Sequence, residues 1–456
     1  MRKNRYLILS VLCLAGAMVP FSSSSVNLAV KNIASELAMN AVAMAWIVTA
    51  MMLPSAVLQI PLGKLGDIFG RKKVLIIGIF LFSCASLGCL LVKTGFALLL
   101  MRFLQGMGAA SMFSATMAII MNIFPKEERG KAIGINTAIV YLALASGPVI
   151  GGLLTQVFGW RSIFIVTACM GFLSLIGIFI LLRNEEWTEV QKGKFDYTGT
   201  AVYSVALVGI LWGFSLLPAV EGILLTAAGL ISLAGFVFIE KKQESPMFEM
   251  RMFLANRVFR FSLFAALINY AATFAIGFLI SLYLQYIKGL NPREAGWILL
   301  AQPVMMMLVS PLAGKWSDKA DAGKIATLGM SVIVVCLSIL AFVSGGTPLW
   351  ILILILLVLG CGFGLFSSPN TNVIMSSVEK RYLGMASATT GTMRQVGQSL
   401  SMGITMMAVS IFVGNIRLTP EVYPSLMKCL RVTFAVFAVL CCAGVYFSAI
   451  RKEKSA

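Results

Sequence analysis

The sequence contains no histidine among its 456 residues. Because histidine is the usual side chain that titrates near neutral pH and the commonest metal ligand, its absence argues against a metal-dependent enzyme. The nine cysteines stand singly except for the neighbours Cys441 and Cys442, and they lack the spacing of a metal site or of an extracellular disulfide framework. No catalytic group of residues is recognisable either. We therefore expect no enzymatic activity, no metal and no cofactor.

Charged residues are also scarce, at 12% of the chain, whereas hydrophobic residues make up 59%. The mean hydropathy of +0.93 is higher than that of a water-soluble protein of this length. About 20 consecutive apolar residues form a helix that can cross a bilayer, and continuous apolar runs exclude the alternating pattern of a β-barrel. The sequence predicts an all-α polytopic membrane protein with fourteen spans, at residues 6–28, 43–62, 74–92, 97–122, 132–156, 161–182, 198–217, 222–239, 261–286, 296–314, 325–343, 349–376, 385–413 and 429–449.

The charges that are present are unevenly signed, with 36 Lys and Arg against 18 Asp and Glu. When the amino terminus is placed in the cytoplasm and the spans alternate, most basic residues fall in cytoplasmic segments. This bias predicts a multi-pass protein of the inner (plasma) membrane with both termini in the cytoplasm. The basic residues are spread thinly over short loops, which argues against a nucleic-acid partner. The first apolar run could also be a cleaved signal peptide, but its removal would upset the charge alternation.

An internal repeat predicts the domain organisation. The segment Pro61–Asp67 ends the second expected span, and the similar segment Pro311–Asp318 ends the tenth. Repeated halves around a central pathway are typical of secondary transporters. The longest internal loops bracket the seventh and eighth spans, so we expect a six-helix bundle over 1–182, a two-helix insert with flanking loops over 183–260 and a second six-helix bundle over 261–456.

The segment Gly63–Lys73 reads GKLGDIFGRKK and lies in the expected cytoplasmic turn between the second and third spans. It resembles the signature loop of the major facilitator superfamily. Glycines allow a tight turn, and Asp67 can meet a helix amino terminus or the nearby cation of Arg71. The alternative is a plain basic inside loop. The expected cytoplasmic gate consists of Gly63, Asp67, Gly70, Arg71 and, in the repeat, Asp318.

Arg102 stands among apolar neighbours in LLLMRFLQGMGAA, which resembles the second motif of the same superfamily. A guanidinium inside a membrane costs a few kcal/mol unless it is paired or faces a wet cavity, so Arg102 is a candidate functional residue. The alternative is an arginine that reaches the outer interface from its place near a helix end.

The fifth span contains Gly147, Pro148, Gly151 and Gly152, a pattern similar to the antiporter motif of the superfamily. Small residues at this spacing allow close helix contact, and a proline inside a helix removes one backbone hydrogen bond and bends it. We expect a hinge here, with ordinary small-residue packing as the alternative. The export direction comes from the resemblance alone.

Two later segments, Gly360–Gly364 and Gly384–Gly397, resemble the fourteen-span drug:proton antiporters of this superfamily. One departure matters. Where that family carries an acid in the first span, this chain has Ser22, and all Asp and Glu fall in loops or at the ends of expected spans. Because a serine does not titrate between pH 5 and 9, Ser22 cannot carry a coupled proton.

These patterns predict a transporter that works by alternating access, with proton-coupled efflux of amphipathic drugs or small organic compounds as its function. The alternatives are a metabolite or organic-anion exchanger or facilitator and, less favoured, a non-transporting membrane sensor. The expected partners are a small-molecule substrate, the lipid bilayer and the proton, and we expect a monomer. The residues expected along the translocation path are Ser22, Asn27, Arg102, Gln302, Arg394 and Gln398.

Overall fold

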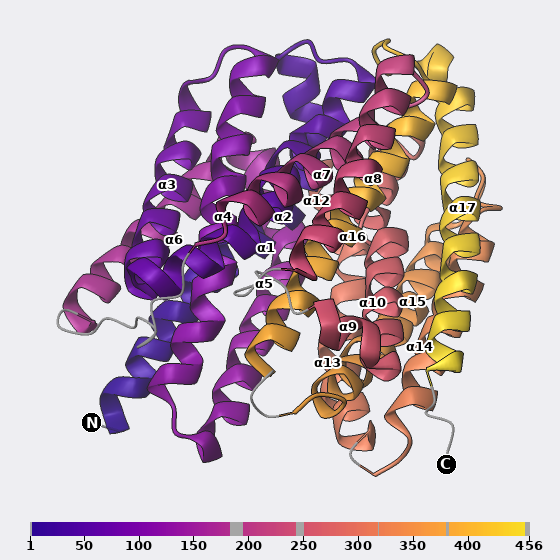
Figure 1. Ribbon diagram of the computed structural model, residues 1–456. Coiled ribbons are helices and arrows are strands. Elements are labelled where there is room, and N and C mark those ends of the chain that lie inside the picture. Colours follow the sequence, from indigo (N-terminus) through magenta and orange to yellow (C-terminus); the bar gives the residue numbers. More distant parts are fainter. Residues whose placement is uncertain (1, 183–194, 243–249, 318, 380–382, 452–456) are drawn as a thin grey trace. The chain divides into compact units, whose positions relative to one another are not determined.

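The computed structural model describes residues 2–182, 195–242, 250–317, 319–379 and 383–451. Over these residues the chain is helical, and no strand occurs among them (Figure 1). The all-α class expected from the apolar runs is therefore confirmed. Helices satisfy their own backbone hydrogen bonds, which is the requirement that lipid imposes on a spanning segment.

The helices form two compact units. Unit 1 comprises Met1–Met39, Trp46–Val208 and Gly229–Met247, and unit 2 comprises Asn40–Ala45, Gly209–Ala228 and Phe248–Ala456. The residues expected to form a separate insert, 183–260, are thus divided between both units. The three-part organisation stays a prediction.

Unit 1 contains the first six long helices and parts of the next two. Their bounds are α1 (Arg2–Glu36), α2 (Ala41–Phe69), α3 (Arg71–Leu91), α4 (Gly95–Ile123), α5 (Lys126–Phe158), α6 (Arg161–Leu181), α7 (Tyr197–Leu216) and α8 (Val220–Glu240). The first residues of α2, the last half of α7 and the first half of α8 belong to unit 2.

Unit 2 contains the remaining helices, several of which are short. Their bounds are α9 (Met250–Ala255), α10 (Arg257–Thr273), α11 (Ile276–Leu282), the π-helical η1 (Tyr283–Ile287), α12 (Pro292–Leu299), α13 (Ala301–Ser317), α14 (Ala322–Leu340), α15 (Leu349–Ser376), α16 (Leu383–Phe412), the 3-10 helix η3 (Pro420–Val422) and α17 (Tyr423–Ile450).

The two units repeat one packing pattern. In unit 1, α1 packs on α5 and α6, and α3 packs on α4 and α6; in unit 2, α10 packs on α16 and α17, and α14 packs on α15 and α17. Each unit also has a glycine pair at equivalent helices. A Cβ atom on Gly108 would lie 2.6 Å from the carbonyl oxygen of Gly78, and one on Gly362 would lie 2.9 Å from that of Gly329. These four positions require glycine because the helix backbones touch there.

Thirteen helical segments of the described chain are long and apolar enough to cross a membrane, with Arg257–Ile287 and Pro292–Ser317 each counted as one segment. They correspond to thirteen of the fourteen expected spans. The expected span 385–413 is the helix α16, which is not among the thirteen although it has 30 residues. At roughly 1.5 Å per residue its length of about 45 Å is sufficient, so polarity, not length, sets α16 apart.

Two expected spans are interrupted. Residues 261–286 fall on α10, α11 and η1, with a break around Phe274 and Ala275, and residues 296–314 fall on α12 and α13. At the first break the Ala275 amide donates to the Ser401 hydroxyl at 3.0 Å, so a side chain of α16 supplies its partner. At the second, Pro303 follows closely and lacks an amide proton, which explains the interruption.

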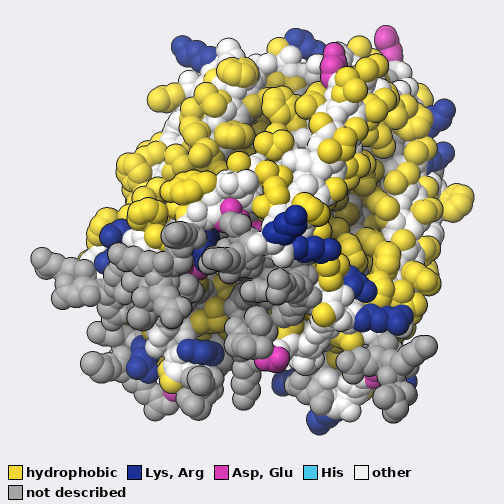
Figure 2. Space-filling model, in the orientation of Figure 1, with side chains coloured by type: hydrophobic (Ala, Val, Ile, Leu, Met, Phe, Trp, Pro, Cys, Tyr) yellow, Lys and Arg dark blue, Asp and Glu magenta, His cyan; other side chains and the backbone are white. Residues whose placement is uncertain are grey.

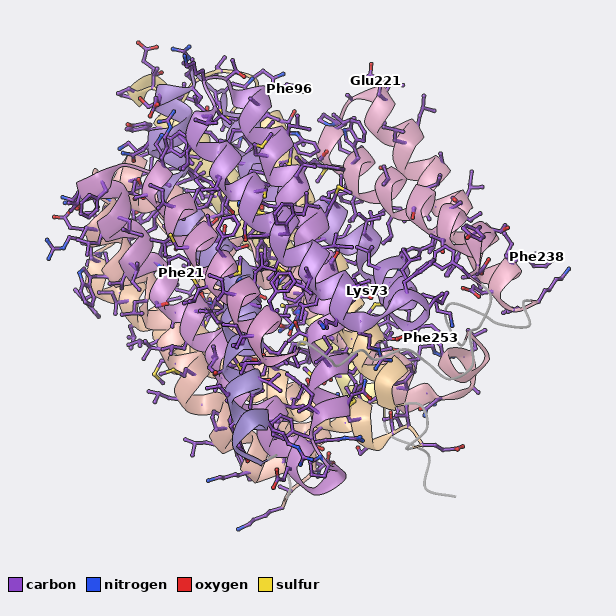
Figure 3. The ribbon with its side chains drawn as sticks, turned by 90° about the vertical axis from the view of Figure 1, so that its left-hand side faces the viewer. Phe21, Lys73, Phe96, Glu221, Phe238 and Phe253 are labelled. Atoms are coloured by element: carbon purple, nitrogen blue, oxygen red, sulfur yellow. The ribbon has the colours of Figure 1, made fainter. Side chains whose placement is uncertain are left out.

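The described surface is largely apolar. Figure 2 shows hydrophobic side chains over much of the visible helical surface. In unit 1, Phe96 at the start of α4 and Phe238 near the end of α8 are 80% and 62% exposed (Figure 3). Extensive exposure of large apolar side chains is unfavourable in water and suits the hydrocarbon of a bilayer.

Candidate functional site

Arg102 is the central polar residue of unit 1. Its side chain is 0% exposed. Nε donates to the carbonyl oxygen of Ile47 on α2 at 2.9 Å, and Nη1 donates to the Ser22 hydroxyl on α1 at 3.2 Å and to Oε1 of Gln105 at 2.8 Å. Gln105 in turn donates to Ser86 on α3 at 2.7 Å. One guanidinium therefore joins α1, α2 and α4, and its network extends to α3.

The burial of Arg102 does not fit an arginine that reaches the outer interface. An arginine that reached the interface would expose its guanidinium, whereas this one is enclosed by protein. Its Nη2 atom is buried without a hydrogen-bond partner, and no described Asp or Glu forms an ion pair with it. Buried donors are normally satisfied, and an unpaired one costs about 1–3 kcal/mol or more when charged. Such an arrangement is typical of a functional group.

The expected hinge lies on a tight seam between α1 and α5. A Cβ atom on Gly151 would lie 2.5 Å from that of Ser25, and one on Gly147 would meet the Ser24 hydroxyl. The Ser25 hydroxyl donates to the Gly147 carbonyl oxygen at 3.0 Å. Ser24 and Ser25, which follow Ser22 in the serine run of α1, thus pack directly on the glycines of α5.

The other expected hinge residues, and the other expected path residue of the first span, lie close to these contacts in sequence. Pro148 is inside α5, and Gly152 follows Gly151 and is buried. Asn27 is half-buried on α1, beyond the serine run. Whether α5 bends during transport stays a prediction.

The expected cytoplasmic gate contains a formed ion pair. Nε of Arg71 donates to Oδ1 of Asp67 at 2.7 Å, and Nη2 forms an ion pair with the same oxygen at 2.7 Å. Gly70 between α2 and α3 has a φ of 112°, a conformation that favours glycine, and it lets α3 begin directly after α2 ends. Gly63 lies against α4, where an added Cβ would be 3.6 Å from that of Ser114. Asp318 lies outside the described residues.

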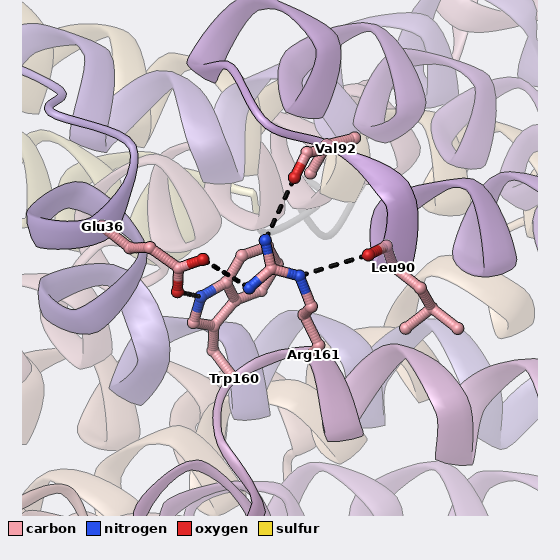
Figure 4. A network of polar contacts seen from close by, with 5 residues as sticks. All are labelled: Glu36, Leu90, Val92, Trp160 and Arg161. Carbon is pink, nitrogen blue, oxygen red and sulfur yellow. Dashed lines mark hydrogen bonds and ion pairs between the residues drawn. The ribbon is translucent and has the colours of Figure 1, made fainter.

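A second charged network, at the other end of unit 1, was not anticipated. Arg161 pairs with Glu36 at 2.5 Å and donates to the carbonyl oxygens of Leu90 and Val92 at 3.2 and 3.0 Å (Figure 4). Trp160 donates to the other Glu36 oxygen at 2.7 Å. These contacts fasten the ends of α1 and α3 to the start of α6. The neighbouring Trp160 and Arg161 are visible in the sequence as a polar and aromatic pair at a span end, but the sequence does not indicate that their partner is Glu36, 124 residues away.

In unit 2 the expected path residues Gln302, Arg394 and Gln398 are all half-buried. The structure brings Ser22 and Arg102 together in unit 1, whereas Gln302 lies on α13 and Arg394 and Gln398 lie on α16.

Arg451, which the sequence places in a cytoplasmic tail, is 3% exposed at the end of α17. It donates to Asn370 Oδ1 at 2.7 Å and to the Gly323 carbonyl oxygen at 2.6 Å. Burial lowers the pKa of Arg451 to about 10, and Asp321 partly offsets that effect, so the guanidinium keeps its charge at neutral pH. The contact fastens α17 to α14 and α15.

Solved structures share this fold. A bacterial homologue of the human lysosomal transporter Spinster, in an inward-facing and unoccupied conformation, matches with a TM-score of 0.69 and 17% identity over 100% of both chains. At this identity the likeness concerns the fold alone.

Curated relatives agree on the class of protein. The riboflavin transporter RibZ of Clostridioides difficile is 31% identical over 402 residues, covering 87% of each chain. The multidrug resistance protein Stp of Mycobacterium tuberculosis is 28% identical over 89% of this chain and 76% of its own. The tetracenomycin C resistance and export protein of Streptomyces glaucescens is 27% identical over 88% and 75%. The family model of the Major Facilitator Superfamily matches residues 12–402. The chain therefore belongs to the Major Facilitator Superfamily of membrane transporters.

Proposed function

We propose that the protein exports small amphipathic organic compounds across the plasma membrane by alternating access of its two units, driven by the proton gradient. Relatives that are multidrug resistance and export proteins support the direction and the breadth of substrates. The protein acts as a monomer, with both termini in the cytoplasm. In this scheme Asp67 and Arg71 hold the cytoplasmic gate, and the α1–α5 seam is the pivot.

The observation that carries this proposal is the fully buried Arg102, which has one unpaired donor and no acidic partner among the described residues. A fixed positive charge disfavours a cationic substrate and favours one with carbonyl, hydroxyl or anionic groups. The first span contributes only Ser22 at this point, at 3.2 Å. Any coupled proton is then carried by a loop-edge acid, such as Asp67 or Glu379, or by an ionisable group of the substrate itself.

We further propose that α16 is the fourteenth span. It is long enough, and it packs on α10 and α17 in unit 2. A polar helix is tolerated within a membrane protein where it faces protein or a water-filled path instead of lipid. With α16 included, the chain has the organisation of two six-helix bundles, 1–182 and 261–456, and a two-helix insert over 183–260.

A metabolite or organic-anion carrier, either an exchanger or a facilitator, is the second candidate function. The same unpaired Arg102 favours it, since a carboxylate could satisfy the free donor. The riboflavin transporter among the relatives also fits a carrier for a metabolite. The two candidates differ in whether substrate movement depends on protons.

Purified protein in liposomes tests the proposal. We define three probes by their charge at neutral pH: riboflavin as the uncharged probe, ethidium as the cationic probe and fluorescein as the anionic probe. Initial rates are measured with and without an imposed pH gradient, against liposomes without protein. We expect the uncharged probe to move fastest and the gradient to increase its rate. Equal rates with and without the gradient favour the second candidate, and no movement of any probe contradicts both.

A further inference from the structure

The polar residues of α16 fall into two groups with different surroundings. Thr390 donates to the Ala386 carbonyl oxygen at 2.8 Å, and Thr405 donates to that of Ser401 at 2.9 Å. Ser401 accepts the Ala275 amide proton. These hydroxyls are satisfied within unit 2. Thr392 and Ser399 are 4% and 2% exposed, yet their hydroxyl oxygens have no hydrogen-bond partner.

The two groups lie on different faces of the helix. Gly397 marks the face toward α10, because an added Cβ there would lie 2.6 Å from the Leu267 carbonyl oxygen. At roughly 100° per residue, Thr390, Ser401 and Thr405 lie within about 80° of Gly397. By the same geometry Thr392, Gln395 and Ser399 lie about 140–160° from it. They therefore form one polar stripe on the face of α16 that points away from α10.

No hydrogen bond among the described residues satisfies the Thr392 and Ser399 hydroxyls of this stripe, although one turn beyond Ser399 the helix packs on Phe214 of α7, at Gly403. An aliphatic side chain of the same size would avoid the cost of a buried hydroxyl without a partner, which is about 1–3 kcal/mol. Two such hydroxyls on one face of α16, the long helix that is not among the thirteen apolar spans of the described chain, indicate a face that meets water or ligand during the transport cycle. Gln395 stands between them and is 4% exposed.

We infer that the Thr392–Gln395–Ser399 stripe is a wall of the substrate path that hydrogen-bonds uncharged polar groups, such as hydroxyls, carbonyls and amides. The stripe carries no charge, so it neither attracts nor repels an ion. It selects substrates by the number and placement of donors and acceptors. This inference rests on the proposed function and adds the substrate class: neutral amphipathic compounds with several hydrogen-bonding groups.

Substitutions that keep shape and remove the hydroxyl test the wall. In Thr392→Val and Ser399→Ala we expect KM for the uncharged probe to rise about two- to tenfold, as for the loss of one net hydrogen bond, with the maximal rate retained. The cationic probe should show no such rise. Thr390→Val and Thr405→Val are matched controls, because their hydroxyls bond to their own helix. They should leave KM unchanged.

Thiol labelling gives an independent readout. In a variant without the nine native cysteines, Thr392→Cys and Ser399→Cys should react with a water-soluble thiol reagent, and the uncharged probe should slow the reaction. Thr405→Cys should stay unreactive. Two results, in protein that transports the uncharged probe, would contradict the inference about the wall and leave the proposed function standing. One is an unchanged KM in both stripe variants, and the other is no labelling at either stripe position. Wild-type liposomes that move no probe contradict the proposed function and the wall with it.

Discussion

At the scale of single residues, the proposed function rests on the contact between Ser22 and Arg102 in unit 1. The family that the chain resembles carries an acid where this protein has Ser22, and the Ser22 hydroxyl lies 3.2 Å from Nη1 of Arg102. An acid there would neutralise the guanidinium directly. With serine there, the buried guanidinium keeps its positive charge without a carboxylate beside it, and under the proposed function this charge disfavours cationic substrates.

Restoring an acid should reverse that preference. In Ser22→Asp the new carboxylate can pair with Arg102, so we expect the rate ratio of cationic to anionic probe to increase about tenfold, which corresponds to about 1.4 kcal/mol. Ser22→Asn has nearly the same shape without charge and serves as the control. A ratio that is the same in Ser22→Asp, Ser22→Asn and wild type would show that Arg102 does not set the charge preference.

Asp67 offers a second test at this scale. Its ion pair with Arg71 is partly exposed, and such pairs contribute about 0–1 kcal/mol to stability. Asp67→Asn should therefore leave the unfolding temperature nearly unchanged. We nevertheless expect transport to fall at least tenfold, because the gate loses its charge. Liposome flux and thermal unfolding of the same preparation separate the two effects, and wild-type flux in this variant would disprove the gate role.

The seam between α1 and α5 is the informative feature at the scale of helices. Gly147 and Gly151 touch Ser24 and Ser25 so closely that an added side chain must separate the helices. Overpacking of this kind costs about 1–3 kcal/mol. If the seam is a pivot, overpacking should destabilise the inward-facing and outward-facing states by different amounts.

A paired substitution on α5 tests the pivot. Gly151→Val should trap one state and change the ratio of cytoplasmic to external labelling at single-cysteine positions. Gly134→Val places the same side chain on the same helix at a position where an added Cβ would meet no neighbouring helix or side chain within 4 Å, so the labelling ratio of this variant should equal that of wild type. An unchanged ratio in Gly151→Val would leave the seam as ordinary helix packing.

The helices also show where sequence-based prediction succeeds and stops. Apolar runs predicted each long helix because lipid permits few alternatives. The break at Ala275 could not be predicted, because its partner Ser401 lies 126 residues away. The same reason hid the contact of Arg161 with Glu36 and the burial of Arg451. Asp67 and Arg71 were predictable as partners because they are neighbours on the chain.

At the scale of the whole molecule, repetition is the main property. Both units pack corresponding helices in the same order. In each unit an arginine also links α6, or its counterpart α17, to the end of α3 or its counterpart α14: Arg161 of α6 donates to the Leu90 carbonyl oxygen of α3, and Arg431 of α17 donates to the Val343 carbonyl oxygen just after α14, at 2.7 Å. Such fastening within a unit suits a body that moves as a whole. In the proposed mechanism of alternating access, the change of access would then come from movement of whole units.

Proton and substrate fluxes measured together test the central claim most directly. Liposomes contain the wild-type protein and an internal pH dye, and the uncharged probe is added on one side only, without an initial pH gradient. The account predicts that the probe crosses the membrane and that protons move in the opposite direction, with both fluxes lost in Asp67→Asn. Probe movement without proton movement, or no probe movement at all, would contradict proton-driven export.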